Sequence, residues 1–254
     1  MLVPDRNLLG TLFYQRELFI WNSNSTQGGI MMDLSPLYIS MKVALTATVF
    51  TFFLGLFAAW KVVKLRRFQG LIDGLFTLPM VLPPTVVGFF LLLLFGKNGL
   101  LGQTLEKLAL TVVFTWEGAV IASAVVAFPL MYRTARGAFE QMDQTLIYAA
   151  RTLGMSERRI FWKIILPSCW PGVAAGTVLS FARALGEFGA TTMLAGNIPG
   201  KTQTMSLAIY SAVQGNHREK AYLWVVIILA ISFLMLLLMN YWTGHQQRTK
   251  KRAV

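Results

Sequence analysis

Residues 43–60 read VALTATVFTFFLGLFAAW, a run of eighteen residues without a charged side chain. Further uncharged runs follow at residues 74–96, 118–132, 164–182 and 221–244. A helix needs about 20 largely apolar residues to cross the hydrocarbon layer of a bilayer. Most of these runs approach or exceed that length. The sequence therefore predicts an all-α, polytopic membrane protein with about five transmembrane helices.

The composition supports this fold class. The chain is 55% hydrophobic and 13% charged, whereas an ordinary soluble domain carries about 25% charged residues. Too little polar sequence remains to cover the surface of a soluble helical protein. The third run is short by itself, and we expect it to extend back through residues 108–116, which places Glu117 within or near that span.

The basic residues predict an orientation. With the N-terminus outside, the inner segments hold 14 of the 23 lysines and arginines, and the outer segments hold 8. The positive-inside rule then favours an outer N-terminus and an inner C-terminus. The same bias accounts for the net charge of +12. No interleaving of basic and aromatic residues points to nucleic acid, so we expect membrane lipid and no nucleic acid as neighbours.

The sequence contains no pattern for catalysis or metal binding. Cys169 is the single cysteine, and His217 and His245 lie far apart. A disulfide within the chain or a multi-cysteine metal site is therefore excluded, and no constellation of nucleophile and base is present. We expect no catalytic residue, no metal and no cofactor bound by this chain.

One stretch resembles a nucleotide-binding loop. Residues 195–202 read AGNIPGKT, with Ala195 in place of the first glycine of the phosphate-loop pattern. Such a loop needs a buried strand before it, yet residues 181–194 are typical of a membrane helix and the predicted orientation puts the loop outside. We interpret Pro199-Gly200 as a turn.

The predicted organisation is an N-terminal tail over residues 1–36, a transmembrane domain over 37–244 with an inner loop at 134–166, and a basic tail over 245–254. One reading of the N-terminal tail is an outer segment with an interfacial helix at residues 8–21. The other is that translation starts at Met31 or Met32, because residues 27–29 can be encoded with a ribosome-binding sequence. Both readings stay open.

Three prolines, Pro79, Pro83 and Pro84, stand at the start of the second run. Proline removes a backbone donor, so we expect a bend there. A bent helix of this kind either lines a solute pathway or marks a packing kink.

The longest polar inner segment contains YAARTLG at residues 148–154 and, nine residues later, IILP at 164–167. We expect two short helices with a break at Gly154, where glycine adopts a backbone conformation closed to other residues. Ser156 is a candidate cap for the second helix, and Pro167 marks the return into the membrane. The exposed segment either docks into another protein or lies on lipid headgroups.

This segment resembles a known signature. The spacing E-A-A-x3-G-x9-I-x-L-P is typical of the membrane subunits of binding-protein-dependent ATP-binding-cassette importers, and it is matched at Ala149, Ala150, Gly154, Ile164, Leu166 and Pro167. Tyr148 departs from it, since the family usually has glutamate there. Within that family, residues 78–88, 149–154, 181–191 and 196–204 resemble the molybdate permease subunits, and the sulfate permease subunits share much of this pattern.

The resemblance implies a type I importer permease in the bacterial cytoplasmic membrane. Two copies of the chain would form the pathway for molybdate, or alternatively for sulfate or tungstate. Two cytoplasmic ATPase subunits would use ATP and Mg²⁺, and an external molybdate-binding protein would deliver the anion. The resemblance assigns contact with the ATPase to the coupling helix, residues Tyr148, Ala149, Ala150, Arg151, Thr152, Leu153 and Gly154. A carrier or channel outside this family is the less favoured reading, since no repeat of helical pairs is apparent.

Arg183 and Glu187 follow the fourth uncharged run, and we expect both to lie at membrane depth within the fourth span. At positions i and i+4 they can form an ion pair, and Arg183 can instead act on a passing dianion. The spacing of Gly172 and Gly176 is that of a helix-packing motif, which we interpret as support for a homodimer.

Overall fold

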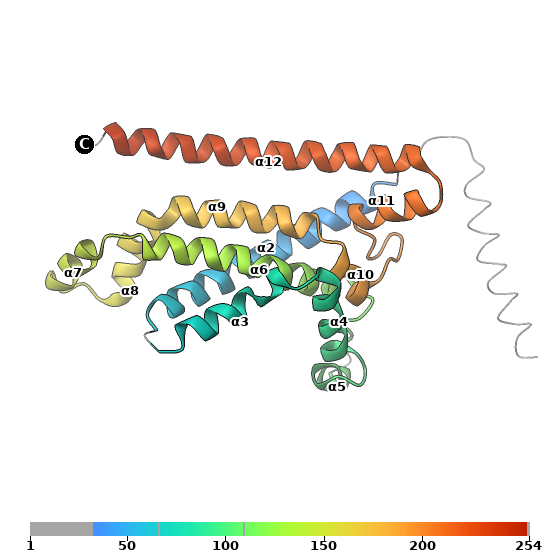
Figure 1. Cartoon of the computed structure of the whole chain (residues 1–254), viewed down its shortest axis with the longest axis horizontal. Coiled ribbons are helices and arrows are strands. Elements are labelled where there is room, and N and C mark those ends of the chain that lie inside the picture. Colours follow the sequence, from blue (N-terminus) through green and yellow to red (C-terminus); the bar gives the residue numbers. More distant parts are fainter. Residues whose placement is uncertain (1–32, 66, 109, 253–254) are drawn as a thin grey trace, which may run out of the picture. The chain divides into compact units, whose positions relative to one another are not determined.

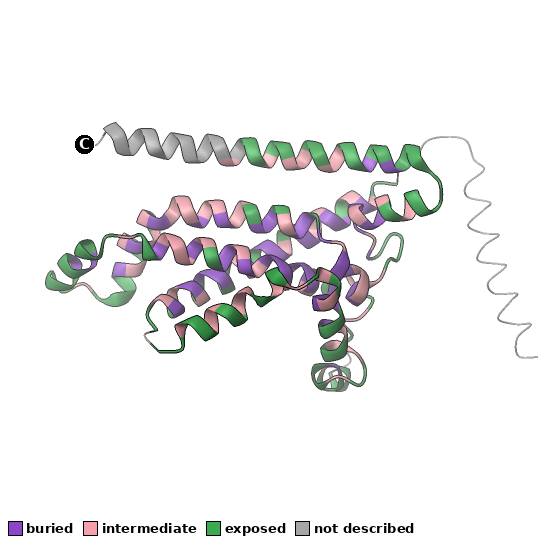
Figure 2. Ribbon diagram, viewed as in Figure 1, coloured by how far each residue is buried: buried purple, intermediate pink, exposed green. Residues whose placement is uncertain are grey.

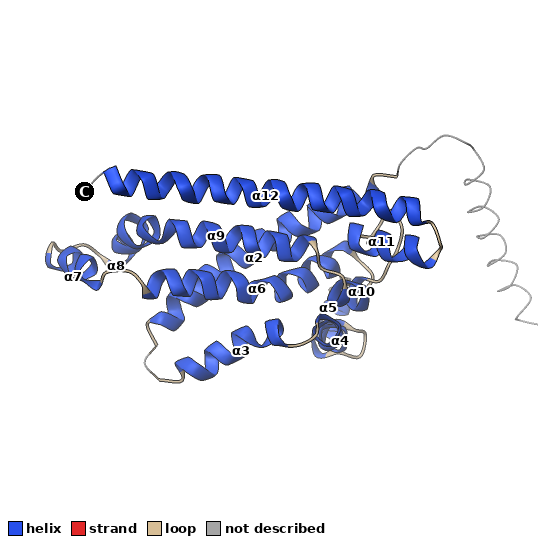
Figure 3. Cartoon of the chain, turned by 45° about the horizontal axis from the view of Figure 1, so that its top comes forward, coloured by secondary structure: helices blue, strands red, loops and turns tan. Residues whose placement is uncertain are grey.

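The computed structural model describes residues 33–65, 67–108 and 110–252, with side chains placed as far as residue 237 and at residue 239. The predictions for residues 1–30 therefore lie outside the described residues. All regular secondary structure in the described ranges is helical, which confirms the all-α class (Figure 3). The helices are α2 (Ser35–Val63), α3 (Gln69–Val81), α4 (Pro84–Phe95), α5 (Leu100–Lys107), α6 (Trp116–Glu140), α7 (Gln144–Thr152), α8 (Glu157–Ile160), the π-helix η1 (Phe161–Ile165), α9 (Leu166–Leu185), α10 (Gly189–Ala195), α11 (Met205–Gln214) and α12 (Arg218–Arg252).

The core is the packing of α2, α6 and α9 against one another (Figure 1). Small residues fill the contacts, because helices in a membrane gain most from close backbone approach. Ala47 and Ala59 of α2 and Ala119 and Ala135 of α6 are fully buried. The core is therefore close-packed through alanine, although the chain is rich in large aromatic and aliphatic residues.

The outward faces have the opposite character. Large apolar side chains of α2, such as Phe53 and Phe57, are mostly exposed, and α12 exposes Val226, Leu229 and Phe233 (Figure 2). Contiguous exposed apolar surface on this scale marks a membrane-facing surface. α12 packs against α9 and α11 but buries few of its own described side chains.

Four described helices are long and apolar enough to cross a membrane, at Ser35–Val63, Trp116–Glu140, Glu157–Leu185 and Arg218–Leu237. A fifth span results if α3 and α4 are counted as one bent pair. The predicted number of about five spans therefore holds only with a broken helix.

The second span is not one helix from residue 74 to 96. The chain bends by 109° between α3 and α4. This bend lies inside the apolar run of residues 74–96. Leu82 and Pro83 have extended ψ angles of 144° and 135°, as expected before a proline. Pro84 then starts α4, whereas Pro79 stays inside α3. The consecutive prolines, and not the first one, break the helix.

The third span does not extend back through residues 108–116. The helix starts at Trp116, where Thr115 Oγ1 accepts a hydrogen bond of 3.2 Å from Gly118 N. It gains its length at the other end and continues to Glu140. A polar N-cap therefore fixes the boundary that hydropathy alone placed too early.

The fourth span also differs from expectation at both ends. The second short helix predicted after Gly154 is continuous with the span through the π-turn η1, in which Leu166 N donates to Phe161 O. This i→i−5 bond accommodates Pro167, which lacks an N–H. At the other end α9 stops at Leu185 and α10 starts at Gly189, so residues 181–194 are not one helix.

The glycine motif of α9 faces its own chain. A Cβ on Gly172 would lie 2.6 Å from Cβ of Ala138, and one on Gly176 would lie 3.1 Å from Cβ of Thr134. Both contacts are on α6. Because α6 occupies this face, the motif supports packing within the chain and gives no support to a homodimer.

Gly88 allows an equally close contact between α4 and α10. A Cβ there would lie 2.7 Å from Cα and 2.9 Å from the carbonyl oxygen of Ala190. We expect Gly88→Ala to lower the free energy of unfolding by about 1–3 kcal/mol, because a backbone contact cannot rotate away. Thermal unfolding in detergent measures this. Gly74→Ala is the matched control, since nothing lies within 4 Å of its Cβ; equal losses for both variants would contradict the account.

Candidate functional site

The signature segment forms a short helix with a defined start. Asp143 precedes α7, and its carboxylate accepts a hydrogen bond of 2.8 Å from Thr145 N. The hydrogen bonds from Thr145 hold the pKa of Asp143 below its ordinary value. α6 ends at Glu140, so only three residues separate the third span from α7. The helix is therefore held directly at the end of a core element.

The end of α7 is also fixed. Gly154 has φ of 72°, Gly154 N donates to Arg151 O at 2.9 Å, and Met155 N donates to Ala150 O at 3.1 Å. This pair of bonds around a left-handed glycine is a Schellman motif. The break at Gly154 agrees with the sequence prediction. Ser156 stands at the cap position of α8, but its side chain makes no capping hydrogen bond.

The two faces of α7 differ in environment. Ile147 and Ala150 are buried where α7 packs against α8 and η1, in the same hydrophobic core cluster as Ile160 and Ile165. Tyr148 and Leu153 are 60% and 81% exposed on the other face, and Ala149, Arg151 and Thr152 are exposed as well. One face thus fixes the helix to the core, while the other presents apolar, aromatic and basic groups outward.

A charged bridge ties α7 to two other elements. Arg151 Nε lies 2.7 Å from Glu157 Oε1, and Lys64 Nζ at the end of α2 lies 3.6 Å from Glu157 Oε2. The contact with Glu157 raises the pKa of the Arg151 guanidinium. Beneath the bridge, the ring centroids of Trp60 and Phe161 are 4.8 Å apart. The segment is therefore anchored at its end as well as at its start.

The second half of the signature has a different setting. Ile164 and Leu166 pack against the core, and Pro167 is exposed on the first turn of α9. The predicted site therefore consists of two parts with different surroundings. Residues 148–154 include the outward surface, whereas residues 164–167 shape the entry of the fourth span.

Arg183 and Glu187 come together. Arg183 Nη1 lies 2.6 Å from Glu187 Oε2, and Glu187 Oε1 accepts a bond of 2.8 Å from Ala190 N. Glu187 lies two residues beyond Leu185, the last residue of α9, so the two residues do not share a helix face. The Glu187 side chain is 1% exposed and that of Arg183 is 32% exposed. The carboxylate therefore also bonds to the first turn of α10.

A polar cluster that sequence reasoning missed links α3 to α6. Arg136 pairs with Asp73 and, at 2.7 Å, with Glu140, while Tyr132 Oη donates to Asp73 Oδ1 at 2.9 Å. The sequence does place Asp73 at the edge of an apolar run, and it places Arg136 and Glu140 four residues apart. This pattern does not predict which helix Asp73 contacts.

The loop that resembles a nucleotide site is a turn. Helix α10 precedes it, Gly200 has φ of 72°, and the Thr202 hydroxyl accepts a bond of 3.0 Å from Ile198 N. The predicted turn at Pro199-Gly200 is confirmed. A helix stands where a phosphate loop needs a strand.

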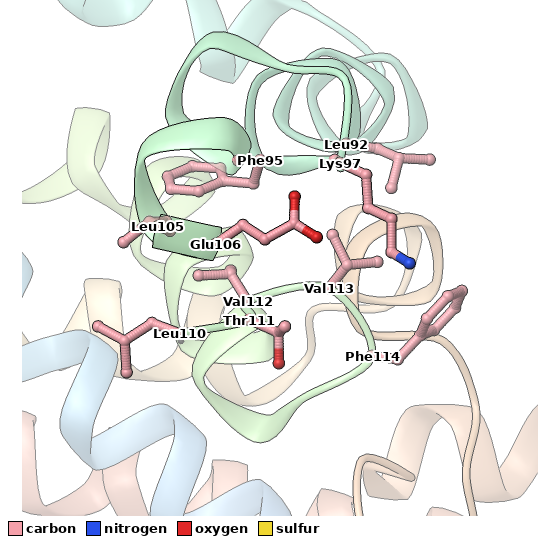
Figure 4. A pocket seen from close by; sticks show the side chains of 12 residues that line it. Leu92, Phe95, Lys97, Leu105, Glu106, Leu110, Thr111, Val112, Val113 and Phe114 are labelled. Carbon is pink, nitrogen blue, oxygen red and sulfur yellow. The ribbon is translucent and has the colours of Figure 1, made fainter. Parts of the chain in front are cut away.

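A cavity of about 360 Å³ lies between α4, α5 and residues 110–114 (Figure 4). Its lining is mostly apolar, and Lys97 and Glu106 are its charged residues. Among the described residues, no group of three or more His, Cys, Asp or Glu side chains is placed to hold a metal ion.

The match to known families is decisive. Residues 51–251 match the family described as binding-protein-dependent transport system inner membrane component. The chain belongs to this family. It is accordingly a transport subunit of the bacterial inner membrane and has no catalytic role of its own, and its family implies an ATPase and a substrate-binding protein as partners.

Curated relatives refine the position within the family. The chain is 48% identical over 206 residues to the putative molybdenum transport system permease protein YvgM of Bacillus subtilis, covering 80% of this chain and 90% of the relative. It is 42% identical over 222 residues to the molybdenum transport system permease protein ModB of Haemophilus influenzae, covering 86% and 96%. Identity to the sulfate transport system permease protein CysT of Escherichia coli is 38% over 204 residues, covering 80% and 73%.

A solved structure supports the fold. The inward-facing MetNI methionine ABC transporter matches with a TM-score of 0.67 at 16% identity, covering 86% of this chain and 99% of that chain. The chain therefore has the fold of an ATP-binding-cassette importer permease.

The left-handed conformation at Gly154 gives a local prediction. Nothing lies within 4 Å of a Cβ at this position, so Gly154→Ala introduces backbone strain and no clash. We expect the Met155 amide to exchange about tenfold faster, as about 1.4 kcal/mol of strain implies. Hydrogen exchange by mass spectrometry measures this. Gly154→Asn, which tolerates the conformation better, should lie between the two; an unchanged Ala variant would contradict the role of the motif.

Proposed function

We propose that this chain is the permease subunit of a molybdate importer that is driven by ATP hydrolysis in a partner subunit. The observation behind the mechanism is the exposed face of α7, which bears Tyr148, Ala149 and Gly154 of the signature segment, while the other face is fixed to the core. The substrate assignment rests on the molybdenum permease relatives, which are more similar to this chain than the sulfate permease relative. Sulfate and tungstate remain the alternatives, since both are also tetrahedral dianions.

The proposed assembly has two copies of this chain, with the N-terminus outside and the C-terminus inside. Two ATPase subunits bind ATP and Mg²⁺ on the cytoplasmic side and each receives one coupling helix. An external molybdate-binding protein delivers the anion to the outer mouth. Tyr148 replaces the glutamate usual in the family, so contact at this position relies on an aromatic surface and on Arg151 beside it.

The anchoring of α7 suggests how the signal passes. Closure of the ATPase pair on ATP moves α7, and Glu157 links α7 to the continuous helix from Glu157 to Leu185. A displacement of α7 therefore shifts the whole fourth span. ATP binding biases the equilibrium between inward-facing and outward-facing states in this way.

The α9–α10 break is our candidate for the anion pathway. Arg183 is partly exposed and is neighboured along the chain by the exposed small residues Ala182 and Gly186. Its charge is balanced by Glu187, so a dianion meets one guanidinium without a ring of basic groups. A weak site of this kind lets an ion enter and leave.

Substitution at Gly154 tests the coupling helix. We expect Gly154→Arg to abolish co-purification of the ATPase subunit and to lower molybdate uptake at least about tenfold, because a long cation then stands at the docking surface. Gly200→Arg is a matched control, since Gly200 has the same φ of 72° and nothing within 4 Å of its Cβ. Normal uptake and co-purification with Gly154→Arg would contradict the coupling role.

A double variant separates the two possible roles of Arg183, as a partner of Glu187 and as a group that acts on the anion. The double variant Arg183→Gln/Glu187→Gln removes both charges together and so avoids an uncompensated buried carboxylate. If Arg183 acts on the anion, uptake falls by about tenfold or more while the protein remains folded, since one charge-assisted hydrogen bond is worth about 1.5–3 kcal/mol. Transport assays with thermal unfolding as the folding control measure this. Uptake at the level of the unmodified chain would leave the pair a purely structural role.

A further inference from the structure

The helix α3 is held in place by a small number of contacts. None of its residues is buried, so the core does not enclose it. Phe76 packs edge-on against Phe128 and Tyr132 of α6, with ring centroids 5.5 and 5.2 Å away. Asp73 accepts a hydrogen bond from the Tyr132 hydroxyl and forms a salt bridge with Arg136. Together these residues form the α3 latch, which we define as Asp73 and Phe76 on α3 with Tyr132 and Arg136 on α6.

Arg136 has a second carboxylate within reach. Its Nε lies 2.7 Å from Oε1 of Glu140, one turn further along α6. If α3 moved away, Arg136 would keep Glu140 as a partner, and Asp73, whose side chain is already 35% exposed, would turn to water. Releasing the α3 latch therefore leaves no buried charge unpaired, which is the main penalty for breaking an ion pair inside a protein.

The α3 latch lies between the two regions that transport has to connect. Arg136 is four residues from the end of α6, and Asp143 starts the coupling segment three residues after that end. On the other side, α3 leads through the 109° bend into α4. Gly88 fixes α4 closely to α10, next to the break that holds Glu187.

We propose that Arg136 is a positioning residue that releases and recaptures Asp73 during the transport cycle, so that movement of the coupling helix reaches the bent α3–α4 pair. Glu140 is the holding partner that makes the release inexpensive. Phe76 guides α3 back to the same place, since its ring packs edge-on against both Phe128 and Tyr132. This inference rests on the proposed coupling role of α7.

The test uses the complete transporter, reconstituted in vesicles with its ATPase and molybdate-binding protein, and measures molybdate transported per ATP hydrolysed. We expect Asp73→Asn to lower this ratio by about fivefold, the factor that corresponds to about 1 kcal/mol, while the ATPase still co-purifies and hydrolyses ATP. Asp73→Glu should largely restore the ratio. Glu140→Gln should slow hydrolysis and uptake together and leave the ratio unchanged, because Arg136 then has Asp73 alone and releases it less readily.

Glu219→Gln is the control for loss of a carboxylate, since Glu219 is exposed on the first turn of α12. A normal ratio for Asp73→Asn, or the same lowered ratio for Glu140→Gln, would overturn the α3 latch. Absence of ATP-driven uptake with the unmodified chain would instead refute the proposed function, and the latch with it.

Discussion

The need to satisfy every backbone hydrogen bond in a bilayer governs this structure. The described membrane helices depart from regular α-geometry at a few places, and each departure has an identifiable chemical cause or hydrogen-bond partner. At η1, an i→i−5 bond from Leu166 N accommodates Pro167. At the α9–α10 break, the Glu187 carboxylate accepts from Ala190 N. At Leu82–Pro84, consecutive prolines turn the chain by 109°. Hydrogen bonds are thus made at η1 and at the α9–α10 break, and at Leu82–Pro84 the missing donors are those that proline lacks.

These interruptions separate two packed groups of helices, which contact each other where α6 packs against α4 and α10. α2, α6, α7 and α9 are joined by close alanine and glycine contacts and by the charged bridge at Glu157. α4 and α10 are joined by the contact at Gly88. Arg183 with Glu187 and Arg136 with Asp73 lie where these two groups meet or connect. The partly buried charges are thus found at the junctions, where a transporter needs discrete alternative contacts.

The sequence predicted the features that depend on local chemistry. Length and apolarity of the runs gave the class, and Gly154 gave the break after α7, because only a few residues adopt a left-handed conformation readily. Features that depend on competition between signals were missed. The hydropathy of the sequence does not indicate that Thr115 caps the third span. The number of prolines does not indicate which of Pro79, Pro83 and Pro84 breaks the helix. The partner of Asp73 depends on tertiary packing. The spacing of Gly172 and Gly176 also could not tell that this face of α9 meets α6 and not a second chain. The fold and half of the candidate site were therefore accessible from sequence, and the contacts between helices were not.

Uptake of labelled molybdate measures ATP-driven passage of the anion. The chain would be expressed with its ATPase and binding protein, and uptake measured with and without ATP and with a large excess of sulfate. The account predicts ATP-dependent uptake that excess sulfate does not suppress. Uptake that sulfate suppresses would contradict the molybdate assignment, and uptake that persists without ATP would contradict the importer mechanism itself.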